Sequence, residues 1–287
     1  MHVEECCQAL LNEILPEVDS DRTGLAIDIG VGTFAFYCQL FDQLKFKTIA
    51  VEPLPNNQLK QLCKHRDIQL LESCISEVDG TVNLYIGSYN GEENLNLNSL
   101  RPDWWGSTAT AKQVQSMTLS QLLQEIAATN ITCMKIDVEG MELSIIQQFL
   151  QLTESLLPKV LMFEYGGGGT QEDGQGGWST ELLNATLKSL EILRSLGYGQ
   201  TILVDLAPDS QEQVIDLQSE NLASTELFPP QSIYGNIIAL RGVQYPEPKI
   251  ASICQLYRDN QAVAPQLRVK ESLLRRASVK MRQLIYR

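Results

Sequence analysis

The sequence predicts an α/β fold built on a doubly wound, mostly parallel sheet. Short apolar runs typical of strands alternate along the chain with segments whose apolar residues recur at helical spacing. Near the N-terminus, a strand-like run passes through Gly30 and Gly32 into a helix-compatible segment. This order of strand, glycine turn and helix is typical of nucleotide-cofactor folds. No internal repeat is apparent, so we expect one α/β core with appendages.

The same patterns place the elements of the first half of the chain. Residues 3–15 carry apolar side chains at helical spacing, so we expect a helix that packs on the domain. The expected elements that follow are a strand at 25–29, a helix at 34–41, a strand at 48–52, a polar helix at 57–64, a strand at 68–75 and a further strand at 81–86. Residues 88–111 show no periodic pattern, so we expect a long loop there, and such loops are usually functional or disordered.

The second half continues the alternation. Thr118 and Gln121 match a capping box, which predicts that an amphipathic helix begins at this point. The expected elements that follow are a strand at 131–138, a helix at 143–150, a strand at 160–163, an irregular glycine-rich tract at 166–177, a helix at 181–196 and strands at 200–205 and 234–240. The helix expected at 181–196 is followed by Gly197, a residue type that commonly ends helices.

Composition and charge restrict the class of protein. The seven cysteines are scattered without metal-type spacing, and neither a signal peptide nor a membrane-spanning stretch is evident, so we expect a cytoplasmic protein. Residues 249–287 carry nine Lys or Arg and two acidic residues, whereas the remainder carries 13 basic and 33 acidic residues. Residues 1–248 are therefore strongly acidic and lack the basic surface that binding to nucleic acid requires. We divide the chain into an N-terminal helix at 1–20, a main domain at 21–242 and a basic helical extension at 243–287.

Asp28 decides how the glycine turn is interpreted. The spacing Gly30-x-Gly32-x-x-Ala35 alone fits a dinucleotide site. A carboxylate at the strand end would repel a pyrophosphate but attract the α-ammonium of S-adenosylmethionine. In the alternative interpretation, Asp28 only caps the helix or binds turn amides. Glu52, at the end of the next strand, suits the two ribose hydroxyls of an adenosine cofactor.

A second charged group surrounds Asp137. A buried parallel strand is normally apolar throughout, yet Lys135 and Asp137 put charges on one face near its carboxyl end, where ligands bind in doubly wound sheets. In the alternative interpretation these two residues neutralise each other, while Glu139 and Glu142 stabilise the N-terminus of the next helix. We favour a functional site because charges are costly to keep near a core for stability alone.

Six segments follow one another in a characteristic order. They are AIDIGVGTF, AVEP, CISEVDG, MTLSQLL, KIDVEGMELSII and VLMFEY, within about residues 24–242. In this order they resemble the FkbM family of S-adenosylmethionine-dependent methyltransferases. The resemblance implies a Rossmann-like class I methyltransferase fold with a seven-strand sheet and an antiparallel final strand. It also implies methylation of a hydroxyl oxygen on a sugar, glycolipid or other natural product.

The resemblance assigns roles to individual residues. It implies that Asp28, Gly30 and Gly32 lie along the methionyl end of the cofactor, Glu52 at its ribose, Ile75 and Ser76 at its adenine, and Asp137 at the methyl-transfer centre. Phe34 is also a candidate cofactor-binding residue. Two features depart from the family pattern. Ser120 replaces the acid that usually follows the Thr–Leu pair, and the glycine tract after Glu164 is longer than usual.

An alcohol acceptor must lose a proton during methyl transfer, and histidine often serves as the base. Only His2 and His65 are present, and neither is well placed. The catalytic candidates are therefore Asp137, then Glu139 and Glu164, with Lys135 beside them. A divalent cation such as Mg²⁺, held by Asp137 and Glu164, is an alternative that uses oxygen ligands.

The acceptor is expected to be a small molecule or glycan. Trp104, Trp105 and Tyr165 are candidates to contact it, although a loop tryptophan is equally often a packing anchor. Residues 270–287 combine apolar spacing with positive charge, so this segment is expected to mediate self-association or contact with a membrane surface.

Two other functions use similar motifs. An NAD(P)-dependent oxidoreductase shares the glycine turn, but Asp28 opposes its pyrophosphate. A non-catalytic scaffold that has kept the cofactor site is the other alternative.

Overall fold

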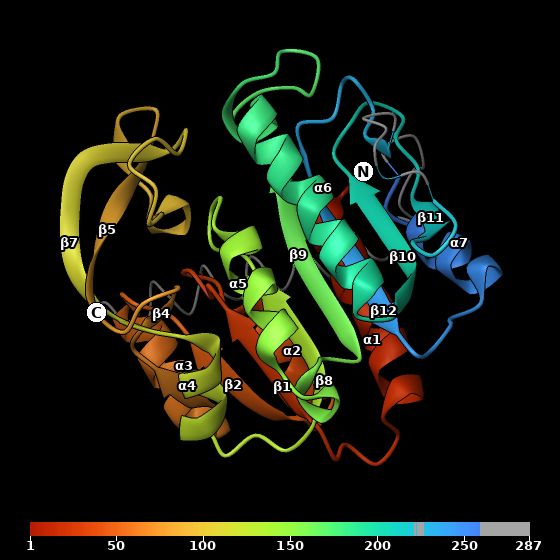
Figure 1. Ribbon diagram of the computed structural model, residues 1–287, viewed down its shortest axis with the longest axis horizontal. Coiled ribbons are helices and arrows are strands. Elements are labelled where there is room, and N and C mark those ends of the chain that lie inside the picture. The colour runs from red at the N-terminus through yellow and green to blue at the C-terminus, as the bar shows by residue number, and fades with distance from the viewer. Residues whose placement is uncertain (221, 223–226, 259–287) are drawn as a thin grey trace, which may run out of the picture.

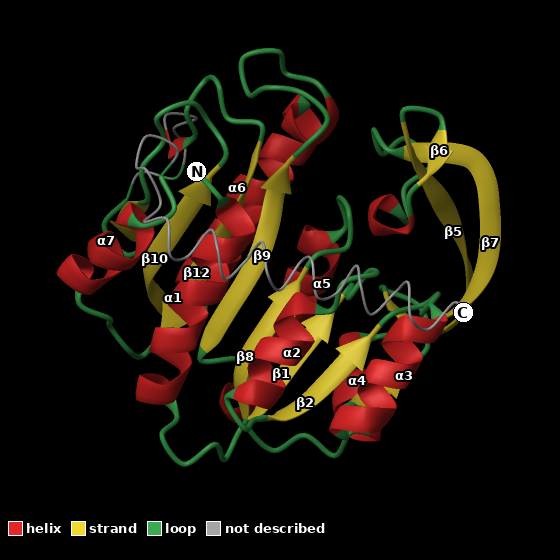
Figure 2. Ribbon diagram, turned by 180° about the vertical axis from the view of Figure 1, so that it is seen from behind, coloured by secondary structure: helices red, strands yellow, loops and turns green. Residues whose placement is uncertain are grey.

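The computed structural model describes residues 1–220, 222 and 227–258. Its centre is an eight-stranded sheet in the order β11-β10-β12-β9-β8-β1-β2-β3, with helices on both faces (Figures 1 and 2). The strands are β1 (Leu25–Ile29), β2 (Lys47–Val51), β3 (Gln69–Leu71), β8 (Ile131–Ile136), β9 (Val160–Gly166), β10 (Tyr198–Asp205), β11 (Gln213–Asp216) and β12 (Tyr234–Arg241). The helices are α1 (Val3–Val18), α2 (Phe36–Gln43), α3 (Asn57–Arg66), α4 (Leu119–Glu125), α5 (Glu142–Gln148), α6 (Thr180–Ser195) and α7 (Glu247–Gln255).

The predicted doubly wound fold is confirmed, but the strand count was wrong. Strands β3, β2, β1, β8 and β9 are parallel, and β12 is antiparallel to both of its neighbours, β9 and β10. The eighth strand, β11, is a four-residue edge strand that pairs antiparallel with β10. Its two apolar residues, Val214 and Ile215, pack partly buried against the two cores, but a run of four residues is too short to show the two-residue period of a strand.

Successive residues of the central strands enter two different cores. In β9, Leu161 and Phe163 join the core beneath α4, α5 and α6, whereas Val160 and Met162 join the core beneath α1, α2 and α7. This alternation is the two-residue period of a strand covered on both faces. It explains why the central strands read as continuous apolar runs.

Two expectations between residues 68 and 117 were wrong. The strand expected at 68–75 is divided between β3 and β4 (Cys74–Ile75), and β4 belongs to a second sheet with the order β4-β7-β5-β6. The loop expected at 88–111 contains much of a long hairpin, which projects beside the main sheet in Figure 1. Its strands are β5 (Gly80–Tyr89), β6 (Glu92–Glu93) and β7 (Ser107–Met117). Most of β7 is exposed on both faces, so its residues are polar and lack the alternation that marks a strand.

The capping box predicted before α4 is confirmed. The Thr118 side chain accepts a hydrogen bond from the Gln121 amide at 3.3 Å, and Gln121 Oε1 accepts one from the Thr118 amide at 3.2 Å. We expect Thr118→Ala to lower the free energy of unfolding by ~1 kcal/mol in chemical denaturation, because it leaves a helix amide without its acceptor. Gln124→Ala, at an exposed position of the same helix, is the matched control. Equal stability of the two variants would contradict a capping role.

The last described helix, α7, packs against α1 through Ile250 and Cys254. The segment expected to mediate self-association or membrane contact, residues 270–287, lies outside the described residues. Within the described ranges, no helix combines the length and apolar character needed to cross a bilayer.

Candidate active site

A cavity of about 720 Å³ lies at the carboxyl ends of β1, β2, β8 and β9. This edge of the sheet is where ligands bind in doubly wound folds. The volume lies within the range of small-molecule sites. Residues 95–98 of the long hairpin line another wall, so the second sheet helps to enclose the cavity.

The glycine turn after β1 forms the floor of the cavity. Gly30 has a φ of +79°, and a Cβ there would lie 1.7 Å from the carbonyl oxygen of Asp137. Only glycine therefore allows the turn to pass so close to the end of β8. Asn96 closes the turn from the second sheet, because its Oδ1 accepts hydrogen bonds from the Thr33 amide at 2.8 Å and from Thr33 Oγ1 at 3.0 Å.

Glu52 is fixed beside this turn. Its two carboxylate oxygens accept hydrogen bonds from the amides of Gly32 and Leu54, both at 3.0 Å. Burial raises the pKa of Glu52, and these amides oppose the rise. Ile75 also lines the cavity, but Ser76 does not: its hydroxyl bonds to Ser116 and to the backbone of Val78. Ser76 therefore does not line this cavity, and its contact with adenine stays a prediction.

Lys135 connects the turn to the carboxylates. Its Nζ lies 3.3 Å from Asp28 Oδ1 and 3.1 Å from Asp137 Oδ2, and it donates a hydrogen bond to the Gly30 carbonyl at 2.8 Å. Burial lowers the pKa of Lys135, but the two carboxylates outweigh burial and leave the pKa above its usual value. Burial has the opposite effect on the carboxyl group of Asp28, whose pKa it raises, and the charge of Lys135 opposes this rise. Asp28 therefore faces a cation of the protein itself, which the sequence interpretation of Asp28 did not include.

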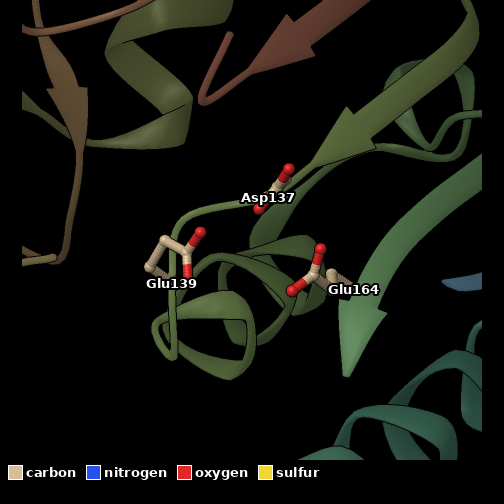
Figure 3. Close-up of side chains that lie close together, drawn as sticks. All are labelled: Asp137, Glu139 and Glu164. Atoms are coloured by element: carbon tan, nitrogen blue, oxygen red, sulfur yellow. The ribbon is translucent and has the colours of Figure 1, made fainter. Parts of the chain in front are cut away.

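Three carboxylates that line the cavity lie close together (Figure 3). One carboxylate oxygen from each of Asp137, Glu139 and Glu164 lies within 4.8 Å of the other two. Asp137 and Glu139 come from the turn between β8 and α5, and Glu164 comes from β9. Glu139 adopts a left-handed φ of +55°, and its carbonyl accepts a hydrogen bond from Ser99 Oγ at 2.6 Å. The second sheet thus helps to hold this strained turn in place.

The surroundings of Glu139 and Glu164 raise the pKa of both side chains. Burial raises the pKa of Glu139 and of Glu164 well above its usual value, and the charge of Asp137 adds to the rise in both. A raised pKa makes the ionised form of a carboxyl group a stronger base than an ordinary carboxylate. The ionised forms of Glu139 and Glu164 therefore accept a proton from a hydroxyl group more readily than exposed carboxylates do.

The neighbouring Glu142 makes stability depend on pH. Its pKa is raised from 4.5 to about 7 by burial, although the amides of Val138 and Gly140 donate hydrogen bonds to it. Between these pH values the folded protein retains a proton that the unfolded chain releases, so the free energy of unfolding falls as the pH rises.

Glu142→Gln removes this titration and keeps an acceptor for both amides. We expect the free energy of unfolding of both proteins to be lower at pH 8 than at pH 5. The decrease should be smaller in the variant than in the parent, by ~1–2 kcal/mol. Urea titrations at pH 5, 6.5 and 8 measure the difference. Parallel curves for the two proteins would show that Glu142 titrates normally.

One cavity is thus lined by three features: the glycine turn after β1, the acidic residue Glu52 after β2 and the carboxylate-rich turn after β8. The sequence profile described as "Methyltransferase FkbM domain" matches residues 26–199, which contain nearly all of these features. The chain belongs to the FkbM methyltransferase family. No curated protein matches the chain.

Two methyltransferases of very different sequence are among the solved structures that match the chain. A Burkholderia thailandensis 1,6-didemethyltoxoflavin-N1-methyltransferase, solved with 1,6-didemethyltoxoflavin and S-adenosylhomocysteine, is 10% identical with a TM-score of 0.37, over 83% of this chain and 79% of that one. A putative O-methyltransferase from Klebsiella pneumoniae is 8% identical with a TM-score of 0.39, over 84% of this chain and 88% of that one.

The aromatic residues expected at the acceptor of this FkbM methyltransferase take different places. Trp105 lines the cavity and lies against Gly167 and Gly168 of the glycine tract. Trp104 is buried against Gly140 and does not line the cavity. Tyr165 is also absent from the lining, because its hydroxyl donates a 2.7 Å hydrogen bond to buried Asp205. Neither Trp104 nor Tyr165 lines this cavity, and acceptor contact by these two residues stays a prediction.

The sequence interpretation missed Glu4 and Asn96. Glu4 lines the cavity from α1, where its carboxylate accepts hydrogen bonds from the Tyr37 hydroxyl at 2.7 Å and from Asn236 Nδ2 at 2.9 Å. Burial raises its pKa, although the Tyr37 hydrogen bond opposes the rise. Glu4 belongs to an amphipathic helix and Asn96 to an irregular tract, so neither position carried a local signal.

Proposed function

We propose that this protein is an S-adenosylmethionine-dependent O-methyltransferase that methylates a hydroxyl group of a sugar, glycolipid or other natural product. The observation that carries the proposal is the meeting of Asp137, Glu139 and Glu164 beside the Gly30–Gly32 turn in one cavity. Membership of the FkbM methyltransferase family supports the reaction class. The carboxylates support an acceptor that must lose a proton, as an alcohol does.

The residues around the turn fit the cofactor. Asp28 Oδ1 accepts no hydrogen bond, although Lys135 lies 3.3 Å away, so it retains capacity for an ammonium group. Glu52 lies across the turn with one further lone pair on each oxygen, which suits ribose hydroxyls. Ile75 offers an apolar wall for adenine. When bound, S-adenosylmethionine supplies an activated methyl group on a positively charged sulfur.

The carboxylates position and deprotonate the acceptor in this proposal. Lys135 holds Asp137 Oδ2, which leaves Oδ1 to accept the hydrogen bond of the acceptor hydroxyl. Glu139 and Glu164, with raised pKa values, accept the proton as the oxygen is methylated. Holding the oxygen in line with the methyl group supplies most of the catalytic effect in such a displacement.

A divalent cation is the second way in which the same carboxylates could act. Oxygen ligands suit Mg²⁺, and Asp137, Glu139 and Glu164 offer one oxygen each. Loss of activity in a chelator, restored by added Mg²⁺, would assign this role to the cluster. Full activity in the chelator would assign proton transfer instead.

The test of the proposal is incubation with methyl-labelled S-adenosylmethionine and a panel of sugars, glycolipids and hydroxylated natural products. We expect the label on an oxygen of at least one acceptor, located by mass spectrometry and NMR. Label found only on nitrogen or carbon would contradict O-methylation.

A further inference from the structure

The charge inside the cavity is one-sided. Among the described residues that line it, Lys135 is the one basic residue, and its Nζ already contacts Asp28, Asp137 and the Gly30 carbonyl. The acidic residues of the lining are Glu4, Asp28, Glu52, Asp137, Glu139 and Glu164. A phosphate or carboxylate on the acceptor would lose its hydration here and find, among the described side chains of the lining, only a cation that is already paired.

The mouth of the cavity is apolar. Phe34 and Phe36 are 56% and 47% exposed, and their rings stack with centroids 5.2 Å apart and planes 4° apart. Tyr89 and Ile233 line the same cavity and are 58% and 41% exposed. Four of the seven large hydrophobic side chains that are exposed in the described part of the chain therefore lie at this cavity. Such a concentration of exposed apolar surface marks a binding site.

We propose that the acceptor is an uncharged amphiphile whose apolar ring or chain binds the stacked pair Phe34–Phe36 while its hydroxyl group reaches Asp137, Glu139 and Glu164. This inference rests on the proposed function and specifies the acceptor: phosphorylated and carboxylated sugars are excluded, and an apolar substituent is required. It also moves Phe34 from the cofactor set to the acceptor set.

The apolar part of the acceptor fits this position better than other occupants do. The mouth and the carboxylates line one continuous cavity, so a single molecule can touch both. A flat apolar group can stack on the exposed ring faces, and such contacts add to the free energy of simple burial. A second copy of the chain would cover the mouth without using the carboxylates.

The first experiment measures the binding of three probes by saturation-transfer difference NMR. All samples contain enough S-adenosylhomocysteine to fill the cofactor site. The probes are 4-nitrophenyl β-D-glucoside, glucose and glucose 6-phosphate. We expect the aryl glucoside to bind about tenfold more tightly than glucose, and glucose 6-phosphate more weakly than glucose. Equal binding of the aryl glucoside and glucose, no binding of the aryl glucoside, or preference for glucose 6-phosphate would overturn the proposal.

The second experiment compares the double variant Phe34→Ala, Phe36→Ala with Leu150→Ala. Leu150 is 57% exposed and does not line the cavity, so it is a matched control. We expect the double variant to lose about tenfold in affinity for the aryl glucoside and the control to lose none. Calorimetry should show unchanged S-adenosylhomocysteine affinity in both.

The outcomes separate the two proposals. Failure of the parent protein to bind S-adenosylhomocysteine would remove the proposed function. If the double variant lost as much affinity for S-adenosylhomocysteine as for the aryl glucoside, Phe34 and Phe36 would be assigned to the cofactor site. That result would overturn the acceptor inference alone. Conversion of a dimer to a monomer by the double variant, seen by size-exclusion chromatography, would assign the mouth to self-association and overturn it as well.

Discussion

Replacing Asp137 by Asn is expected to lower kcat for methyl transfer by at least about a hundredfold. Asp137 Oδ2 lies 3.1 Å from Lys135, and the residue faces both Glu139 and Glu164 in the cluster. Asparagine keeps the size and one acceptor oxygen, but it loses the negative charge that draws the hydroxyl proton. S-adenosylhomocysteine affinity should change little, because the loss concerns the transition state.

The control for this prediction is Glu172→Gln, an exposed acidic residue outside the cavity. Steady-state kinetics should show parental kcat for the control, while calorimetry shows that both variants bind S-adenosylhomocysteine. Parental kcat in Asp137→Asn would reduce Asp137 to a structural role and contradict the proposed chemistry.

Lys135→Met is expected to lower the free energy of unfolding by ~3 kcal/mol or more. Lys135 and Asp28 are 4% and 1% exposed, so the variant leaves Asp28 buried without its cation and also leaves the Gly30 carbonyl without its donor. Removing one member of a buried ion pair costs far more than removing an exposed pair. Urea denaturation measures this difference.

Lys188→Met provides the matched control, since Lys188 pairs with Glu191 at 2.9 Å on the exposed face of α6. We expect a loss of less than ~1 kcal/mol there. Adding Asp28→Asn to Lys135→Met should recover part of the stability, because the unpaired buried charge is removed. A double variant less stable than Lys135→Met would show that Asp28 and Lys135 do not act as a pair.

Features encoded by neighbouring residues could be predicted from the sequence. The buried strand before Gly30, the glycine turn and the Thr118 capping box depend on residues within a few positions of one another. Asp137, Glu139 and Glu164 could be expected together because the carboxyl ends of adjacent parallel strands share one edge of the sheet.

Features that depend on distant contacts could not be predicted. Glu4 reaches the cavity through Tyr37 and Asn236, which lie 33 and 232 positions along the chain. Trp104 and Trp105 are adjacent in the sequence and have the same side chain, yet Trp104 packs against Gly140 and Trp105 packs against Gly167 and Gly168. Only the packing of the completed fold distinguishes such residues.

The most direct test of the account is an isothermal titration of the folded protein with S-adenosylhomocysteine and, separately, with NADH. The account predicts one S-adenosylhomocysteine bound per chain with about micromolar affinity and no heat of binding with NADH, because Asp28 favours a cationic ligand end and opposes a pyrophosphate. Binding of NADH without S-adenosylhomocysteine would indicate an oxidoreductase, and binding of neither would show that the cavity holds no nucleotide cofactor. Either result would contradict a methyltransferase that uses this cavity.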